Sequence, residues 1–367
     1  MNIQNKNNIA IVHDSLTHLG GAENVLFNLI EIFPNADIYT SIINKKYLKK
    51  LNNISKGKVY FSKLSNIKLA RNNPDFFKPY ILHYWQKLNL DKYDLVISSS
   101  HSFSSNWVNV KGKHISYIYT PPRYLYREFN EMYFLKRFPL KQIFFLYFNI
   151  IRHIDFKKIQ KIDLLIAISK NVQNRILKYY KRKAIVIYPP VTLRKKTYSN
   201  NKRNYYLFFS RLVKQKGAEL AIKAFNENGK DLLVVGEGKE KGKLKKIAKS
   251  NIKYLGFQSE NKLDKIFTKV KALIYCSIDE DFGIIPVEAM SNGVPVIAYN
   301  SGGVKETIIN NKTGIFFNKY NPDNLNKSIK IFESKILNYE DCIKQANKFR
   351  KEIFSREIQK QVKNLLP

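Results

Sequence analysis

The 367-residue sequence is poor in cysteine, since it contains only Cys276 and Cys342. Two cysteines are too few for a disulfide framework, and neither stands at a spacing typical of metal ligands. No uncharged apolar run reaches the roughly 18 to 20 residues that a membrane-spanning helix needs. The polar start of the chain, residues 1–8, shows no signal-peptide pattern. These absences predict a protein of the reducing cytoplasm that is soluble or bound peripherally to a membrane.

The sequence also lacks the short motifs of several common enzyme classes. It contains no P-loop, no G-x-S-x-G nucleophile elbow and no H-E-x-x-H zinc motif. Its six histidines are scattered along the chain. We therefore expect neither a cofactor nor a bound metal ion.

Acidic residues are scarce. The chain has 64 lysine and arginine residues against 29 aspartate and glutamate residues, which gives a formal net charge of +35. Such a charge suits polyanionic partners. However, the lysines are spread over the whole chain, without zinc-finger spacing, an RNP-like strand or a basic repeat. We interpret the charge as a compositional bias combined with attraction to an anionic membrane surface, and we expect no nucleic acid as the main partner.

Short apolar segments alternate with helical patterns along most of the chain, which is typical of parallel sheets covered by helices on both faces. The predicted strands cover residues 9–13, 37–43, 94–98, 114–118, 163–169 and 184–188, and then residues 205–210, 231–235, 253–256, 272–275 and 294–299. Between the two sets, residues 193–204 are polar, basic and without periodicity, as in an interdomain linker. The sequence therefore predicts an α/β protein with two Rossmann-like, doubly wound parallel-sheet domains, at residues 1–192 and 205–340. A C-terminal helix over residues 341–367 is long enough to cross back to the first domain.

Residues 134–157 differ from the rest of the first domain because they combine aromatic, apolar and basic side chains. This composition is compatible with a helix that lies in a membrane interface. The alternative is a core helix of the first domain, since the apolar run shows no wide polar face.

A segment near residue 280 holds two glutamates around a Phe282-Gly283 turn, between a predicted strand and a predicted helix. Glu280 would lie in the loop after the strand, and Glu288 inside the helix. Gly283 lets the backbone amides of the helix start face a ligand, and helix starts attract phosphate. This arrangement favours a site for a sugar attached to a diphosphate, although ordinary solvated acids could show the same pattern.

Two cations bracket a second strand-to-helix loop. Arg211 and Lys216 follow a predicted strand, and Gly217 precedes a predicted helix. Ligands of open α/β sheets bind at the carboxyl edge of the strands, where these cations would neutralise a diphosphate. In the first domain, Gly20 and Gly21 stand at the corresponding place and would let the backbone approach a phosphate or sugar, unless they form only a turn.

Together these elements resemble the retaining glycosyltransferases of the two-Rossmann-domain class, known as group 1 or family 4. The family's E-x(7)-E element matches residues 280–288, its Arg-Leu-x-x-x-Lys-Gly element matches residues 211–217, and its early Gly-Gly-Ala-Glu matches residues 20–23. The segments 117–124 and 187–191 are similar to a mannosyltransferase-like subgroup of O-antigen or capsule enzymes. The resemblance implies the GT-B arrangement, in which the two domains face each other across a cleft.

The resemblance also implies roles for these residues. Glu280 would bind hydroxyls of the donor sugar, and Glu288 would bind the ribose. Arg211, Lys216 and the amides of residues 282–285 would hold the diphosphate, while Gly20 and Gly21 would face it from the first domain. This assignment places Phe282, Gly283, Ile284 and Ile285 in the loop that binds the sugar donor.

One position departs from the family pattern. Related sequences usually have histidine where this chain has Tyr119, and that histidine lies near the reacting centre. The ordinary pKa of tyrosine is unsuitable for a base near pH 7. His101 and Asp14 are possible substitutes that the sequence does not rank, and Arg123 is a further candidate on the acceptor side.

The predicted function is retaining, metal-independent transfer of a hexose, mannose-like, from a GDP- or UDP-sugar to a lipid-linked or polysaccharide acceptor at the inner face of the cell membrane. A nucleotide-sugar epimerase of similar architecture is the alternative enzyme. A non-catalytic basic scaffold that binds membrane or nucleic acid is the alternative outside the enzymes.

Overall fold

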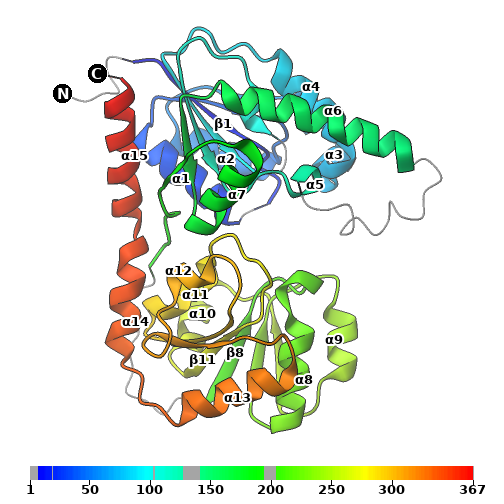
Figure 1. The fold of residues 1–367 in the computed structure, drawn as a ribbon, viewed down its shortest axis with the longest axis vertical. Helices are drawn as coiled ribbons and strands as arrows, with labels where there is room; N and C mark the ends of the chain where they lie inside the picture. Colours follow the sequence, from blue (N-terminus) through cyan, green and yellow to red (C-terminus); the bar gives the residue numbers. More distant parts are fainter. Residues whose placement is uncertain (1–6, 19, 102–103, 127–140, 194–203, 367) are drawn as a thin grey trace. The chain divides into compact units, whose positions relative to one another are not determined.

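A computed structural model describes residues 7–18, 20–101, 104–126, 141–193 and 204–366 (Figure 1). The chain divides into two compact units. Unit 1 comprises Met1–Pro190 together with Phe354–Pro367, and unit 2 comprises Val191–Ile353.

Unit 1 is built on a parallel sheet. Its strands are β1 (Ile9–His13), β2 (Asp37–Thr40), β3 (Val59–Phe61), β4 (Leu95–Ser100), β5 (Lys113–Ile118), β6 (Leu164–Ala167) and β7 (Ile185–Val186). They lie in the order β3-β2-β1-β4-β5-β6-β7, and every paired neighbour is parallel. All residues of β1 and β4 are buried, as expected for central strands with both faces covered.

The helices of unit 1 cover this sheet. They are α1 (Gly21–Ile32), α2 (Lys45–Ile54), α3 (Lys68–Asn72), α4 (Lys78–Lys87), α5 (Arg123–Tyr126), α6 (Lys141–Gln160) and α7 (Lys170–Tyr180), with 3-10 turns η2 (Lys63–Asn66), η3 (Pro74–Phe77) and η4 (Ser105–Trp107). The stripe Val25, Leu26, Leu29 and Ile30 of α1 is buried, as the sequence spacing predicts.

Unit 2 repeats the architecture. Its strands are β8 (Tyr205–Phe209), β9 (Leu232–Val235), β10 (Ile252–Gly256), β11 (Val270–Tyr275), β12 (Val296–Tyr299) and β13 (Gly314–Phe317), in the parallel order β10-β9-β8-β11-β12-β13. The helical elements are η7 (Lys214–Lys216), α8 (Ala218–Asn228), α9 (Lys241–Ile247), α10 (Glu260–Phe267), α11 (Ile284–Ser291), α12 (Val304–Thr307), α13 (Pro322–Glu333), α14 (Tyr339–Ala346), η8 (Asn347–Phe349) and the first residues of α15 (Lys351–Leu365).

Both sheets reverse their strand order in the middle. In unit 1 the chain builds outward from β1 to β3 and then returns to place β4 on the other side of β1. In unit 2 it does the same with β8 and β11. Such switch points separate the loops at the carboxyl ends of the two central strands, and they are where doubly wound sheets bind ligands. The fold therefore marks one candidate place in each unit.

The predicted fold class, two doubly wound parallel-sheet domains, is confirmed. Strands β3 and β13 were not predicted, and the strand expected over 184–188 is reduced to Ile185–Val186. The sequence predicts a linker over 193–204, and most of it, residues 194–203, lies outside the described residues.

The C-terminal segment also differs from the single helix that the sequence predicts. It is divided into α14 and α15 around Asn347–Arg350, where the Phe349 carbonyl accepts a hydrogen bond from the Val191 amide. Residues 354–365 of α15 belong to unit 1, where the Phe354 ring packs edge-on against Tyr117 at 5.7 Å.

The segment predicted as an interfacial helix forms α6, although residues 134–140 lie outside the described part of the chain. The helix contributes to the core through Ile151, and its fully buried Asp155 accepts hydrogen bonds from Trp107, Tyr126 and Tyr180. Leu146 and Ile150 are more than half exposed. The core-helix interpretation therefore describes one side of α6, and membrane contact of the other side stays a prediction. Among the described residues, no helix is long and apolar enough to cross a membrane.

Candidate active site

The first candidate place follows β11 in unit 2, where the chain forms a tightly packed loop. The Glu280 carbonyl accepts a hydrogen bond from the Gly303 amide at 2.7 Å. Gly302 has a φ of 72°, and a Cβ at this position would lie 2.4 Å from the Glu280 carbonyl oxygen. Only glycine permits this approach of two backbones. The loop that carries Glu280 is thus fixed by its own backbone.

The Glu280 carboxylate gathers three donors. Its Oε2 accepts hydrogen bonds from Lys216 Nζ at 2.5 Å, Ser277 Oγ at 2.6 Å and Tyr275 Oη at 2.8 Å. The side chains of the ion pair are 18% (Lys216) and 21% (Glu280) exposed, so the pair is largely shielded but still open to solvent. We call these four residues the Glu280 cluster.

The electrostatics of the Glu280 cluster favour the ionised carboxylate. Burial raises the pKa of Glu280, but the attraction of the Lys216 ammonium and the three hydrogen bonds outweigh it, so the pKa lies below its usual value. Burial and the neighbouring carboxylate raise the pKa of Tyr275 well above its ordinary value. Tyr275 is therefore a neutral donor near pH 7, and Glu280 is an acceptor rather than an acid.

Lys216 reaches Glu280 because of the turn that precedes α8. Gly217 caps this helix with a φ of 71°, and a Cβ there would lie 2.4 Å from the Cys276 carbonyl oxygen. The Ile278 amide donates to the Gln215 carbonyl at 3.2 Å, which ties the two loops together. An ammonium has three N–H groups, so Lys216 can bind Glu280 and an anion at the same time.

The other predicted residues of unit 2 lie around the same strand ends. Gly283, with a φ of 92°, caps α11, and Ile284 and Ile285 are its first residues. Glu288 lies one turn further along the helix and is half-buried. The Phe282 ring is buried against Phe349 at a centroid distance of 5.3 Å, so only its backbone can face a ligand.

Arg211 follows β8 and is exposed. No hydrogen bond or ion pair joins its guanidinium to the Glu280 cluster in the part of the chain that the structure describes. The structure thus brings Lys216 and Glu280 into contact and leaves Arg211 outside that contact.

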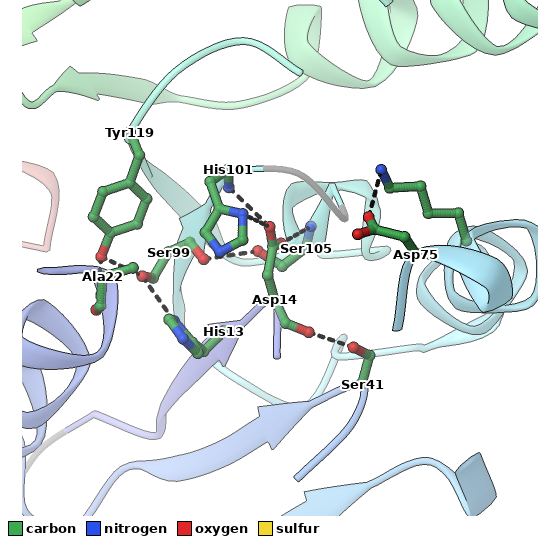
Figure 2. A network of polar contacts seen from close by, with 10 residues as sticks. His13, Asp14, Ala22, Ser41, Asp75, Ser99, His101, Ser105 and Tyr119 are labelled. Carbon is green, nitrogen blue, oxygen red and sulfur yellow. Dashed lines mark hydrogen bonds and ion pairs between the residues drawn. The ribbon is translucent and has the colours of Figure 1, made fainter. Parts of the chain in front are cut away.

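The second candidate place is the switch point of unit 1, shown in Figure 2. Asp14, directly after β1, is fully buried, and its carboxylate accepts hydrogen bonds from the amides of His101 at 2.9 Å and Ser105 at 2.8 Å. The His101 Nδ1 lies 3.2 Å from the same Asp14 oxygen that the His101 amide contacts. His101 and Ser105, which follow β4, therefore both hold the carboxylate of Asp14.

A second set of contacts runs beside Asp14 (Figure 2). His13 Nδ1 lies 3.0 Å from Ser99 Oγ, which lies 2.9 Å from Tyr119 Oη, and Tyr119 Oη donates to the Ala22 carbonyl at 3.0 Å. Because the Ala22 carbonyl can only accept, Tyr119 donates to it. Ser99 then donates to Tyr119, and the His13 Nδ1 donates to Ser99. We call Asp14, His101 and this row of residues the His101 cluster.

Burial dominates the titration of this row. It lowers the pKa of His13 and raises the pKa of Tyr119 well above its usual value. Tyr119 is therefore a neutral side chain whose hydroxyl connects β4 and β5 with the first turn of α1. It does not have the properties of a base near pH 7.

The remaining predicted residues of unit 1 lie at helix starts. Gly20 is the extended N-cap of α1, and Gly21 is its first residue. Arg123 begins α5 and is half-buried. The roles assigned to these residues from the sequence stay predictions.

Sequence reasoning missed two members of the Glu280 cluster, Tyr275 and Ser277, and it did not connect Ser99 with His13. A signal was present in each case, because these polar residues stand at or directly after the carboxyl ends of β11, β4 and β1. A cavity of about 580 Å³ lies elsewhere, beside Tyr205 at the amino end of β8, and belongs to neither cluster.

Comparison with solved structures identifies the fold. HepE of Anabaena, solved in complex with UDP-glucose, has a TM-score of 0.69 at 18% identity, covering 98% of this chain and 100% of that one. The fold is that of the two-Rossmann-domain (GT-B) glycosyltransferases.

The sequence of unit 2 is similar to a known family. Residues 191–349, which lie in unit 2, match the family Glycosyl transferases group 1. An uncharacterized glycosyltransferase of Methanocaldococcus jannaschii is 32% identical over 200 residues, 53% of this chain and 55% of that protein. The O-antigen chain mannosyltransferase RfbU of Salmonella typhimurium is 27% identical over 217 residues, 55% of this chain and 58% of that protein. The chain spans about half or less of the length of the first curated relatives that it matches.

Proposed function

We propose that the protein transfers a mannose-like hexose from a nucleotide-diphosphate sugar to a lipid-linked or polysaccharide acceptor. The transfer retains the stereochemistry of the donor sugar and uses no metal ion. The observation that carries the proposal is the Lys216–Glu280 ion pair at the switch point of the sheet that bears the group 1 domain. The naming of RfbU as a mannosyltransferase and the presence of UDP-glucose in the HepE structure support a nucleotide-sugar donor.

In this proposal the Glu280 cluster binds the donor. Lys216 donates to the diphosphate while it remains paired with Glu280, and it neutralises the charge that grows on the leaving phosphate. The amides of Ile284 and Ile285 at the start of α11 add donors for the same anion, since the first N–H groups of a helix have no partner within it. Glu280 binds hydroxyls of the donor sugar, Glu288 the ribose, and Arg211 the diphosphate.

Unit 1 would serve the acceptor, and a cationic surface would hold the protein at the inner face of the membrane. The net charge of +35 supports attraction to anionic lipids. The exposed Leu146 and Ile150 of α6 add apolar side chains that a membrane interface accommodates.

The test is nucleotide release from a panel of GDP- and UDP-sugars, with and without acceptor. We expect Lys216→Ala to lower kcat/KM at least about 100-fold, as loss of one transition-state donor does. Glu280→Gln should have a comparable effect, because it removes the charge that holds Lys216 and the acceptor assigned to the sugar hydroxyls. Arg211→Ala should lower it as well, because the guanidinium is assigned to the diphosphate. Full turnover in Glu280→Gln and Arg211→Ala would contradict the assignment.

Matched controls use exposed residues of the same unit, Glu340→Gln and Lys246→Ala, which should leave turnover unchanged. A thermal-shift screen with GDP and UDP identifies the base, because a ligand that binds only the folded state stabilises it. Product formation without any acceptor would instead indicate an epimerase.

A further inference from the structure

We propose that His101 binds the hydroxyl group of the acceptor through its Nε2 atom, and that Asp14 is the positioning residue that holds the imidazole for this task. The inference rests on the proposed function and assigns the acceptor side of it. It concerns a hydroxyl-bearing acceptor such as a glycoside, whatever lipid or polysaccharide carries that hydroxyl.

The first argument is the way in which His101 is held. One oxygen of Asp14 is bonded by the His101 amide at 2.9 Å and approached by the His101 Nδ1 at 3.2 Å, so backbone and side chain converge on the same atom. The other oxygen accepts from Ser105 at 2.8 Å. A buried carboxylate is costly unless it is hydrogen-bonded in this way, which makes the arrangement rigid. The direction of the ring is therefore set before any ligand binds.

The second argument concerns the proton on the ring. An ionised carboxylate only accepts hydrogen bonds, so the Nδ1 of His101 must be the donor to Asp14. In the neutral imidazole the Nε2 atom is then an acceptor. An acceptor of fixed direction suits a hydroxyl group, which has a proton to donate.

The third argument is access. The His101 side chain is 24% exposed, whereas His13 and His114 are buried. His18, His83 and His153 are exposed, but no carboxylate pairs with them within the described ranges. His101 thus combines a fixed orientation with contact to solvent, at the carboxyl edge of the central strands.

The fourth argument is that Tyr119 is already engaged. Its hydroxyl donates to Ala22 and lies beside Ser99, while its ring stands at 66° to the His101 ring with centroids 5.9 Å apart. Tyr119 therefore forms a wall next to His101, and the imidazole is the group that meets the ligand.

Titratable groups from three elements surround His101. His13 ends β1, Asp14 follows it, and Tyr119 follows β5. Glu23, in the first turn of α1, interacts electrostatically with His13 and Tyr119. Protonation of His101 would abolish its capacity to accept a hydrogen bond at Nε2. Acceptor binding should therefore weaken on acidification, whereas nucleotide binding by unit 2 does not involve this ring.

The experiment compares wild-type protein with His101→Ala, His101→Gln and Asp14→Asn, and with His153→Gln as the matched control for an exposed histidine of the same unit. The probe is a panel of octyl hexosides as acceptors, assayed across pH with the donor sugar that wild-type protein uses. Thermal unfolding and nucleotide affinity verify that each variant is folded.

We expect His101→Ala to lower kcat/KM for the octyl hexoside roughly tenfold or more, mainly through KM, with unchanged nucleotide affinity. His101→Gln keeps an acceptor oxygen that does not titrate, so it should recover part of the activity and lose the acidic limb of the pH profile. Asp14→Asn should also raise KM for the octyl hexoside, because a carboxamide can donate to Nδ1 as well as accept from it and no longer fixes the proton on that atom.

Two failures are distinguishable. If wild-type protein transfers sugar and His101→Ala equals His153→Gln at every pH, the His101 inference is overturned and the proposed function stands. If wild-type protein releases no nucleotide from any donor with any octyl hexoside, both are overturned. An Asp14→Asn variant with an unchanged KM for the octyl hexoside would remove Asp14 from the proposal and leave His101 alone.

Discussion

Each unit places one carboxylate at its switch point, but the two carboxylates are held in different ways. Asp14 in unit 1 is fully buried and is bound by two backbone amides and by His101. Glu280 in unit 2 is one-fifth exposed and is bound by the side chains of Lys216, Ser277 and Tyr275. Backbone donors cannot leave without unfolding the loop, whereas side chains can change partners.

This difference matches two kinds of task. A carboxylate fixed by the backbone orients a neighbouring ring, as Asp14 orients His101. A carboxylate held by an ammonium keeps a cation in place that can also bind an arriving anion, as Glu280 does with Lys216. In the proposed function the switch point thus serves orientation in unit 1, where the carboxylate follows β1, and charge neutralisation in unit 2, where the carboxylate follows β11.

The largest effect that separates the units should be their response to acid. Burial lowers the pKa of His114 in unit 1 to about 4, from 6.5. Below pH 6.5 the unfolded chain therefore binds a proton at His114 that the folded unit does not bind. The contribution of His114 to the free energy of unfolding is complete above pH 6.5 and is lost as the pH falls toward 4. At 1.36 kcal/mol per unit, the loss is on the order of 3 kcal/mol. In unit 2 the lowered pKa of Glu280 reduces the free energy of unfolding only as the pH falls below the ordinary pKa of a carboxyl group.

The two tryptophans, Trp85 and Trp107, both lie in unit 1, so tryptophan fluorescence reports its unfolding alone. Denaturant titrations between pH 7 and 4.5 should show the loss in wild-type protein and a flatter dependence in His114→Gln. His13, whose pKa is also lowered, adds to the loss, and Asp155, whose pKa burial raises, opposes it. Both cancel in the comparison. Equal slopes for the two proteins would contradict the prediction.

A second test asks whether the Glu280 loop needs its close backbone approach. Gly302 and Gly229 have similar φ angles of 72° and 69°, but a Cβ at Gly302 meets the Glu280 carbonyl at 2.4 Å, while a Cβ at Gly229 meets nothing within 4 Å. Gly229→Ala should cost about 1 kcal/mol of unfolding free energy from its backbone conformation alone. Gly302→Ala should cost about 2 kcal/mol more, from the contact. Chemical denaturation followed by circular dichroism measures both, and equal losses would show that the loop adapts.

The smallest expected effect concerns Tyr119. Tyr119→Phe removes a hydroxyl that donates to Ala22, which should cost about 1 kcal/mol of stability. Turnover should change only a few-fold, because the hydroxyl is used within the protein. A loss of turnover comparable to that of Lys216→Ala, without a loss of stability, would give Tyr119 a direct role and weaken the case for His101.

Much of the fold could be predicted from local patterns. Apolar runs such as residues 9–13 and 205–210 identified central strands with an accuracy of about one residue, because strands buried on both faces are apolar throughout. The short edge strand Val59–Phe61 was missed, since it is only partly buried and carries no such run. The division between α14 and α15 was missed as well, because it depends on a hydrogen bond to the distant Val191.

The candidate sites were predicted unequally. Glu280, Lys216 and the start of α11 were found from the sequence because charged residues and glycines stand together after strands. Their pairing was not found, and neither was the support of Glu280 by Tyr275 and Ser277. In unit 1 the sequence left His101, Asp14 and Tyr119 as unranked alternatives. The structure distinguishes them, because the His101 ring is paired with Asp14 whereas the Tyr119 hydroxyl donates to the Ala22 carbonyl.

The sequence by itself determined the class of the fold and the resemblance of its second half to group 1 glycosyltransferases, because periodicity, strand-end polar residues and short motifs are local properties. Only the tertiary structure decided which strand ends meet. Lys216 and Glu280 are 64 residues apart, and Asp14 and His101 are 87 apart. Their contacts exist because β11 returns beside β8 and β4 beside β1. Strand order is fixed by the packing of helices on both faces of the whole sheet, and no local pattern encodes it.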